Sequence, residues 1–159
     1  MSRRCLVLLV VAFLAAVPFV GAADKAEIKP SEKWTGTYPT NKLDQLPKEQ
    51  RETAVGYIGD AKTFKAVWKA WKPDDKLPEV DFKKNVVIFT RNTKFLNRIN
   101  IAKITLEDGK LDLVALETRT ANPIEDKVHM AMAVIPRKGV KNIKVGDKSI
   151  KVAAPAEKK

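Results

Sequence analysis

The chain has 159 residues, with 30 Lys and Arg against 19 Asp and Glu, and a formal net charge of +11. One cysteine and one histidine exclude a disulfide framework and a Cys/His zinc site. This length suits a single domain with one ordinary hydrophobic core that needs no covalent cross-links.

Residues 1–22 have the layout of a secretory signal peptide. Two arginines give a positive start, residues 5–20 are almost wholly apolar, and small residues precede a polar segment. The apolar stretch is shorter than the roughly 20 residues that span a bilayer, so we expect cleavage after Ala22 rather than a retained anchor. The mature chain is then secreted or periplasmic and lacks Cys5, the only thiol. It keeps 28 Lys and Arg against 19 Asp and Glu, a net charge of +9.

Both ends of the mature chain predict flexible segments. Residues 23–33 alternate charges with few apolar groups, and residues 153–159 are rich in Ala, Pro and Lys. Neither end buries enough apolar surface to offset the entropy cost of ordering. We therefore expect one domain over residues 34–152, between a flexible N-terminal segment and a flexible C-terminal tail.

The first half of this domain contains one clearly predicted helix. Residues 34–50 mix two aromatics with Gly, Pro and Asn and predict a loop, with one short strand as an alternative. A strand at residues 53–58 ends at a glycine. Asp60 is a preferred N-cap residue for the helix that follows, and Pro73 stops it. The apolar side chains at i, i+3, i+4 and i+7 share one helical face: Phe64, Val67, Trp68 and Trp71.

The second half predicts strands. Residues 85–91 form a continuous apolar, β-branched run that fits a strand buried on both faces. Asp108-Gly109 and a second Gly-Asp turn predict two hairpins. The remaining predicted strands cover residues 98–106, 110–118, 127–136, 140–145 and 149–152. The order predicts an α+β fold, with one amphipathic helix packed on a largely antiparallel β-sheet or open barrel of about six strands.

The predicted helix also carries a basic stripe beside its apolar face. The stripe is formed by Lys62, Lys65, Lys69 and Lys72. It offers a contact for an anionic polymer, a membrane surface or an acidic partner; the alternative is a solvated face that aids solubility. Nucleic acid is disfavoured, because we expect export and because the helix aromatics share the apolar face rather than the lysine face.

Residues 90–100, TRNTKFLNRIN, follow a buried strand and predict a polar connection at one end of the sheet. The candidates for partner binding here are Arg91, Asn92, Lys94, Phe95, Asn97 and Arg98. Two arginines beside amide side chains suit bidentate recognition of a carboxylate or an acidic peptide. Arginine with an aromatic is typical of interface hot spots. The alternative is a polar loop whose Phe95 and Leu96 fill the core.

His129 is the only histidine, and one alternative function is a small hydrolase that uses it with a carboxylate. The chain has no G-x-S-x-G elbow, no phosphate loop and no twelve-residue calcium loop. The sequence therefore predicts no catalytic residue, no cofactor and no metal ligand set.

The segment YIGDAKTFKAVWKAWKPDDKLPEVDFKKNVVIFTRN is similar to the PrcB-like domain family of exported bacterial proteins. The family pattern F-x-x-x-W, followed by P-x-V-D-F and a strand, matches Phe64, Trp68, Pro78, Val80, Asp81 and Phe82. HMAMAVIPRKGV resembles the closing strand of the family, so the resemblance covers roughly residues 55–140. TKFLNRIN stands where the family usually carries a Gly-Gly-Tyr segment. The resemblance implies a non-enzymatic accessory domain, since at least one member associates with a secreted protease complex.

These observations together predict an exported, basic, non-enzymatic binding or accessory module. Its expected partner is an exported protein, such as a protease, or an anionic envelope polymer. Two alternatives remain open at this point, the hydrolase on His129 and a structural envelope protein without a discrete site.

Overall fold

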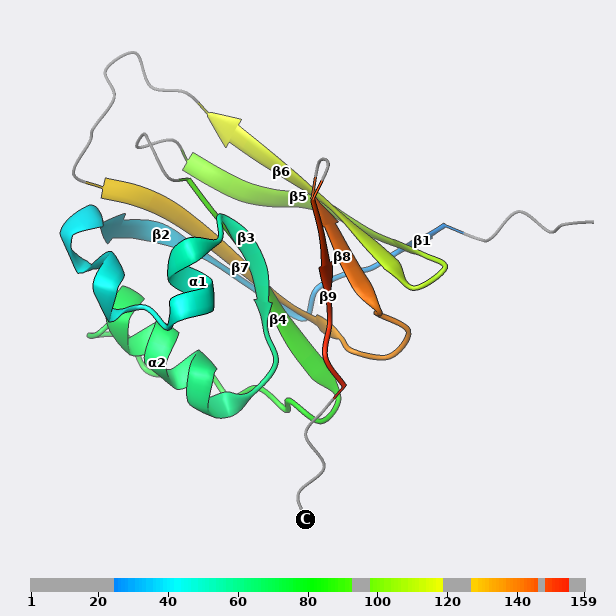
Figure 1. The fold of residues 1–159 in the computed structure, drawn as a ribbon, viewed down its shortest axis with the longest axis horizontal. Coiled ribbons are helices and arrows are strands. Elements are labelled where there is room, and N and C mark those ends of the chain that lie inside the picture. The colour runs from blue at the N-terminus through cyan, green and yellow to red at the C-terminus, as the bar shows by residue number, and fades with distance from the viewer. Residues whose placement is uncertain (1–24, 93–97, 119–126, 146–147, 155–159) are drawn as a thin grey trace, which may run out of the picture.

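The computed structural model describes residues 25–92, 98–118, 127–145 and 148–154. These residues form the predicted α+β fold, with two mostly antiparallel sheets, neither of which closes into a barrel (Figure 1). The four-stranded sheet has the order β2 (Glu32–Pro39), β7 (Lys127–Pro136), β4 (Asn85–Arg91), β3 (Val55–Ile58). The five-stranded sheet has the order β1 (Ala26–Glu27), β5 (Arg98–Glu107), β6 (Lys110–Thr118), β8 (Asn142–Val145), β9 (Lys148–Lys151). β6 and β8 form the one parallel pair among these strands.

Helix α2 (Ala61–Trp71) begins where the sequence predicts. The Asp60 carboxylate accepts a hydrogen bond from the backbone N–H of Thr63 at 2.8 Å, which satisfies one of the free donors of the first turn. The helix ends before Pro73, and its four predicted apolar side chains are all buried. Trp68 stands edge-on to Trp34 of β2, with ring centroids 5.2 Å apart. The aromatic face of α2 is therefore core, as its spacing predicts.

Two hydrophobic cores lie on opposite faces of the four-stranded sheet. One packs α2 against the sheet and includes Val87 and Phe89 of β4. The other packs the two sheets together and includes Val86 and Ile88 of the same strand. The prediction that residues 85–91 are buried on both faces is thus confirmed, and residues 128–135 of β7 are buried in the same way. The molecule has three layers, helix, four-stranded sheet and five-stranded sheet (Figure 1).

The N-terminal third contains more regular structure than the sequence predicts. Residues 34–50 were expected to form a loop, but β2 extends to Pro39, a 3-10 helix covers Thr40–Gln45 and helix α1 covers Lys48–Glu52. β2 pairs with β7 along its whole length. The expected loop is wrong because Trp34 and Tyr38 pack into the helix-side core while the residues between them complete the ladder.

Residues 25–33 were expected to be flexible but contribute to both sheets. Ile28 N–H donates to the carbonyl of Ile104, and Ser31 N–H donates to the carbonyl of Val134. Both residues of β1 are exposed. Composition did not reveal these strands, because backbone hydrogen bonds to existing sheet edges hold them rather than buried side chains of their own.

Both predicted hairpins are present, and the strand count is higher than expected. Asp108 and Gly109 have φ of 49° and 79°, the positive values that the Asp-Gly turn between β5 and β6 requires. β8 and β9 form the second hairpin. The described residues form nine strands rather than about six, with β1 and β2 added in the first part of the described chain. Among the described residues, no helix is long and apolar enough to cross a membrane.

Candidate functional site

Arg91 is a buried structural residue, not an exposed binding residue. It is the last residue of β4 and is 6% exposed. Its Nε donates to the carbonyl of Thr53 at 3.0 Å, and its Nη2 donates to the carbonyl of Arg51. Burial lowers the pKa of the guanidinium, which stays protonated at any physiological pH. The prediction failed because Arg91 continues the inward alternation of Val87 and Phe89.

Asn92 is also buried, so it does not serve as an open contact. Its backbone N–H donates to the carbonyl of His129 at 2.9 Å, and its side-chain amide donates to Glu117. It therefore joins the ends of β4, β6 and β7. Lys94, Phe95 and Asn97, the other expected contacts of this stretch, lie outside the described residues.

His129 lies between the two sheets and is 8% exposed. Its Nδ1 accepts a hydrogen bond from the backbone N–H of Ile99 at 3.1 Å. Burial, and secondly the positive charge of Arg98, lowers the pKa of the imidazole, and a ring whose Nδ1 accepts a hydrogen bond is in its neutral form. Within the described part of the chain, no carboxylate bonds to this ring. The arrangement links β5 to β7 and does not form an acid–base pair.

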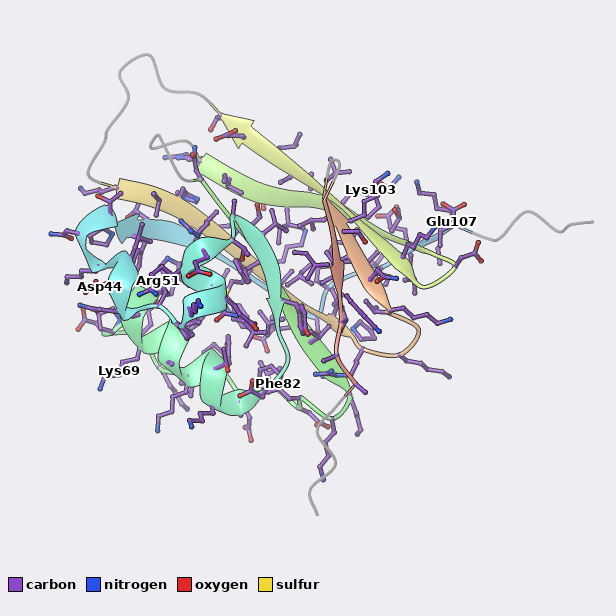
Figure 2. All side chains as sticks on the ribbon, in the orientation of Figure 1. Asp44, Arg51, Lys69, Phe82, Lys103 and Glu107 are labelled. Carbon is purple, nitrogen blue, oxygen red and sulfur yellow. The ribbon has the colours of Figure 1, made fainter. Side chains whose placement is uncertain are left out.

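Three of the four lysines of the basic stripe form no ion pair within the described part of the chain. Lys62, Lys65 and Lys69 are exposed and have no ion-pair partner among the described residues, and Lys69 points away from the helix into solvent (Figure 2). Lys72 differs, because its Nζ pairs with Asp75 at 2.9 Å and lies 5.3 Å from the ring centroid of Trp71. It is held against the core instead of extending the stripe.

The side of the five-stranded sheet that faces away from the core carries exposed apolar side chains beside cations. Leu116 is 61% exposed and Val114 is 43% exposed, and both point outward from β6. Across the β5–β6 ladder, Leu116 pairs with Asn100 and Val114 pairs with Lys103. We define the outer sheet face by its exposed residues Arg98, Asn100, Lys103, Val114, Leu116 and Lys144.

Two cations of the outer sheet face differ in their pairing. Arg98, the one exposed member of the predicted contact set that the structure describes, has no ion-pair partner among the described residues. Lys103 lies 3.9 Å from Glu27, and both side chains are more than half exposed, so this pair is weak. Sequence reasoning placed Arg98 where the polar connection meets the next predicted strand, and it did not identify Val114 and Leu116 as surface residues. Residues 111–116 carry apolar side chains on both faces of the predicted strand, except at Asp112. This pattern could have indicated an apolar patch on the outer face.

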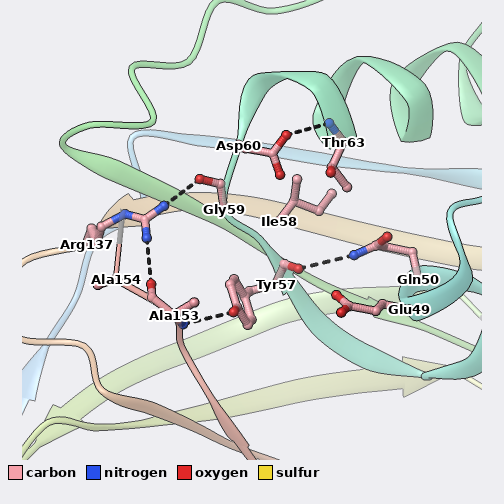
Figure 3. Close-up of a pocket in the computed structure, with 10 residues that line it drawn as sticks. All are labelled: Glu49, Gln50, Tyr57, Ile58, Gly59, Asp60, Thr63, Arg137, Ala153 and Ala154. Carbon is pink, nitrogen blue, oxygen red and sulfur yellow. Dashed lines mark hydrogen bonds between the residues drawn. The ribbon is translucent and has the colours of Figure 1, made fainter. Parts of the chain in front are cut away.

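A pocket of roughly 190 Å³ lies between β3, the start of α2 and the C-terminal segment (Figure 3). Arg137, 8% exposed, lies in its wall and donates to the carbonyls of Gly59 at 2.6 Å and Ala153 at 3.0 Å. The Tyr57 hydroxyl accepts from the backbone N–H of Ala153 at 2.9 Å. These groups bond to one another across the pocket, so they tie chain segments together.

The described residues offer no metal centre, because no group of three or more metal-ligating side chains occurs among them. Comparisons with known proteins add no relationship. No protein family, curated protein or solved structure matches this chain.

Proposed function

We propose that this chain is an exported, non-enzymatic binding module that recognises an acidic protein partner through the outer sheet face. The observation that carries the proposal is the exposure of Leu116 and Val114 on a face with two cations, Lys103 opposite Val114 and Arg98 one outward position beyond the partner of Leu116; Arg98 has no ion-pair partner among the described residues. Exposed apolar side chains beside arginine supply both contact area and charge-assisted hydrogen bonds. The described residues bring no histidine, carboxylate and nucleophile together, so recognition suits this surface better than chemistry.

The accessory character of the module rests on two further supports. Its high net positive charge favours acidic partners and speeds their approach. The resemblance of residues 55–140 to PrcB-like domains implies an accessory role, for which an exported protease is a fitting partner. The layout of residues 1–22, which is typical of a secretory signal peptide, supports the exported location in this proposal.

The test is a comparison of three purified forms immobilised on a matrix and exposed to the exported proteins of the cells that make the chain. We expect Arg98→Ser/Leu116→Ser to lose a bound protein that the parent retains at 150 mM salt. The triple variant Lys62→Ser/Lys65→Ser/Lys69→Ser should retain it, because it lowers the charge without touching the outer sheet face. Equal retention by the parent and the double variant would contradict the proposal.

A second candidate is binding of an anionic envelope polymer through α2, favoured by the three exposed lysines without ion-pair partners in the described part. This candidate predicts the opposite pattern on a dextran sulfate column. The triple lysine variant would then elute at clearly lower salt than the double variant, because each lost polymer contact lowers the salt dependence.

A further inference from the structure

Strand β2 is an edge strand of the four-stranded sheet, and its outer side is open. On one side it pairs with β7 along its whole length, and no described strand pairs with it on the other side. Along β2, three exposed residues alternate with residues on the helix side of the sheet. The exposed three are Lys33, Thr35 and Thr37.

The direction of the backbone groups of β2 follows from the hydrogen bonds between β7 and β4. The carbonyl of His129 accepts from Asn92 N–H, and Arg137 N–H just beyond β7 donates to Lys84. The odd-numbered residues of β7 therefore face β4, because residues of an antiparallel strand alternate in the side to which their N–H and C=O groups point. The even-numbered residues face β2 and pair with its even-numbered residues.

The N–H and C=O groups of Lys33, Thr35 and Thr37 consequently point to the open side. Within the described part of the chain, no group donates to or accepts from the backbone of these three residues. Lysine often blocks an edge, but the Nζ of Lys33 is held 3.0 Å from the carbonyl of Ile101. Pro39, which has no N–H, ends the open stretch. An added strand therefore meets three successive pairing positions.

These pairing positions are self-complementary about Thr35. If a second β2 pairs antiparallel with the two Thr35 residues opposite each other, Lys33 lies opposite the partner's Thr37. Each of the three resulting pairs exchanges two backbone hydrogen bonds, and a cross-strand threonine pair is itself favourable. The two copies of Lys33 stand four residues apart along the strands, about 13 Å, so like charges do not oppose each other.

Gly36 provides a further fit to a second copy. The same register places Gly36 opposite the partner's Trp34 in a non-hydrogen-bonded pair, where the side chains of two strands come closest. An aromatic side chain opposite an edge glycine covers the backbone that the glycine leaves bare. Packing within one chain does not require the glycine, because a Cβ there would make an ordinary contact of 3.4 Å with the Trp71 ring. Trp34 is only partly buried at this edge.

The local charge of this edge also suits a second copy. The chain has a net charge of +11, so much of its surface repels an identical chain. Residues 31–38 contain one glutamate and one lysine, and their charges cancel. Two copies can therefore approach each other along β2 without bringing a surplus of positive charge to the contact.

We infer that two copies of the chain pair through β2 about Thr35 and join their four-stranded sheets into one continuous sheet. The two-fold axis is perpendicular to the sheet, so both α2 helices lie on the same face of it. The basic stripes of the two copies then add to one positive surface, and screening by salt strengthens the dimer. This inference goes beyond the proposed function, because the outer sheet face takes no part in the pairing.

The first test measures dimerisation by analytical ultracentrifugation at about 100 μM protein and high salt, which screens the repulsion between net charges. Thr35→Pro removes the N–H at the centre of the pairing, and an outward-facing edge position tolerates proline. Thr35→Ser is the matched control, because it keeps that N–H. We expect a dimeric parent, a Thr35→Ser variant that matches it, and dimerisation of Thr35→Pro that is at least about tenfold weaker. A monomeric parent, or a folded Thr35→Pro that dimerises like the parent, overturns the inference.

A second test reads the register by disulfide cross-linking in a Cys5→Ser background. Thr35→Cys places two thiols on opposite residues with Cα atoms about 5.5 Å apart, which a disulfide can bridge. Thr37→Cys is the matched control, because its two copies lie about 13 Å apart along the strands. We expect mild oxidation to convert only Thr35→Cys to a covalent dimer on a non-reducing gel. Absence of that dimer, or equal cross-linking of both variants, overturns the inference. If Thr35→Pro does not fold, this test decides.

Other occupants and other interfaces give different results. Arg98→Ser/Leu116→Ser is expected to dimerise like the parent. A dimer that is lost in this double variant and kept in Thr35→Pro would place the interface on the outer sheet face and overturn the inference. A monomeric parent that retains an exported protein, which Thr35→Pro fails to retain, would assign the edge to that protein and overturn pairing with a second copy.

Discussion

Arg91 and Arg98 are the same residue type on consecutive strands, but their surroundings give them different roles. Arg91 is enclosed, and carbonyls of residues 51 and 53 accept its hydrogen bonds. Arg98 is exposed at the start of β5 and opposite Thr118. The first contributes to stability and the second is available to a partner. Residue type alone does not distinguish them.

A pair of substitutions checks this assignment. We expect Arg91→Met to lower the free energy of unfolding by about 2 kcal/mol, because it removes the charged donor that binds the carbonyls of Arg51 and Thr53. Arg98→Gln should change it by less than about 0.5 kcal/mol, as exposed substitutions usually do. Urea unfolding followed by tryptophan fluorescence measures both. Equal losses in the two variants would show that Arg98 is structural as well.

At the scale of single elements, α2 depends on its first turn. The hydrogen bond from Thr63 to Asp60 fixes where the helix begins, and the Trp68 and Trp71 face is then directed at the sheet. Burial raises the pKa of the Asp60 carboxyl, but the hydrogen bonds from Thr63 and the nearby Lys62 outweigh it and lower the pKa overall. The ionised carboxylate is therefore the form that caps the helix.

Asp60→Ala is expected to lower the free energy of unfolding by about 1 kcal/mol near pH 7, the usual cost of losing an N-cap. The folded-state pKa lies below the unfolded value of 3.8, so the carboxylate contributes stability above that value and loses it as the pH falls through the folded pKa. The difference between parent and variant should thus shrink in acid. Asp60→Asn, which keeps a capping oxygen, serves as the control, and thermal unfolding at pH 7 and pH 2.5 gives the comparison.

The elements that could be predicted from the sequence are those that a local pattern of residue types identifies, without knowledge of their tertiary contacts. The spacing of the apolar side chains in α2, the double-sided burial of β4 and the Asp108-Gly109 turn were all predictable. In β2, exposed residues alternate with less exposed ones from Trp34 to Tyr38. In the sequence this alternation is hard to recognise, because Gly36 stands at one of the inward positions. A Cβ at Gly36 would lie 3.4 Å from the Trp71 ring, which is an ordinary contact, so the packing does not require this glycine. The division into two sheets depends on long-range pairing.

The candidate site was predictable only in part for the same reason. Arg98 was expected to be accessible and is, whereas the enclosure of Arg91 and Asn92 depends on carbonyls contributed by residues 51, 53 and 129.

At the scale of the whole molecule, Arg137 connects three distant parts of the chain. It follows β7, its guanidinium reaches the carbonyl of Gly59 before α2, and it also holds the carbonyl of Ala153 after β9. Its backbone N–H donates to Lys84. One side chain thus fixes the C-terminal segment to the junction of sheet and helix.

We expect Arg137→Gln to lower the free energy of unfolding by about 2–3 kcal/mol and to release the C-terminal segment first, because hydrogen bonds from a charged donor are lost on both sides. Hydrogen exchange should show faster exchange in β9 than in β4. Lys138→Gln, at an exposed neighbouring position, is the control and should leave both rates unchanged. Uniform acceleration across the molecule would argue against a local clamp.

The central position of β7 has a consequence for the order in which the molecule forms. β2 and β4 flank β7, and β7 lines both cores. During synthesis, the amino-terminal portion of the chain emerges from the ribosome long before residue 127. Until then β2 lacks its described strand partner, and neither core can close. We therefore expect the two cores to form only after β7 has been synthesised, so that folding is completed late in the synthesis of the chain.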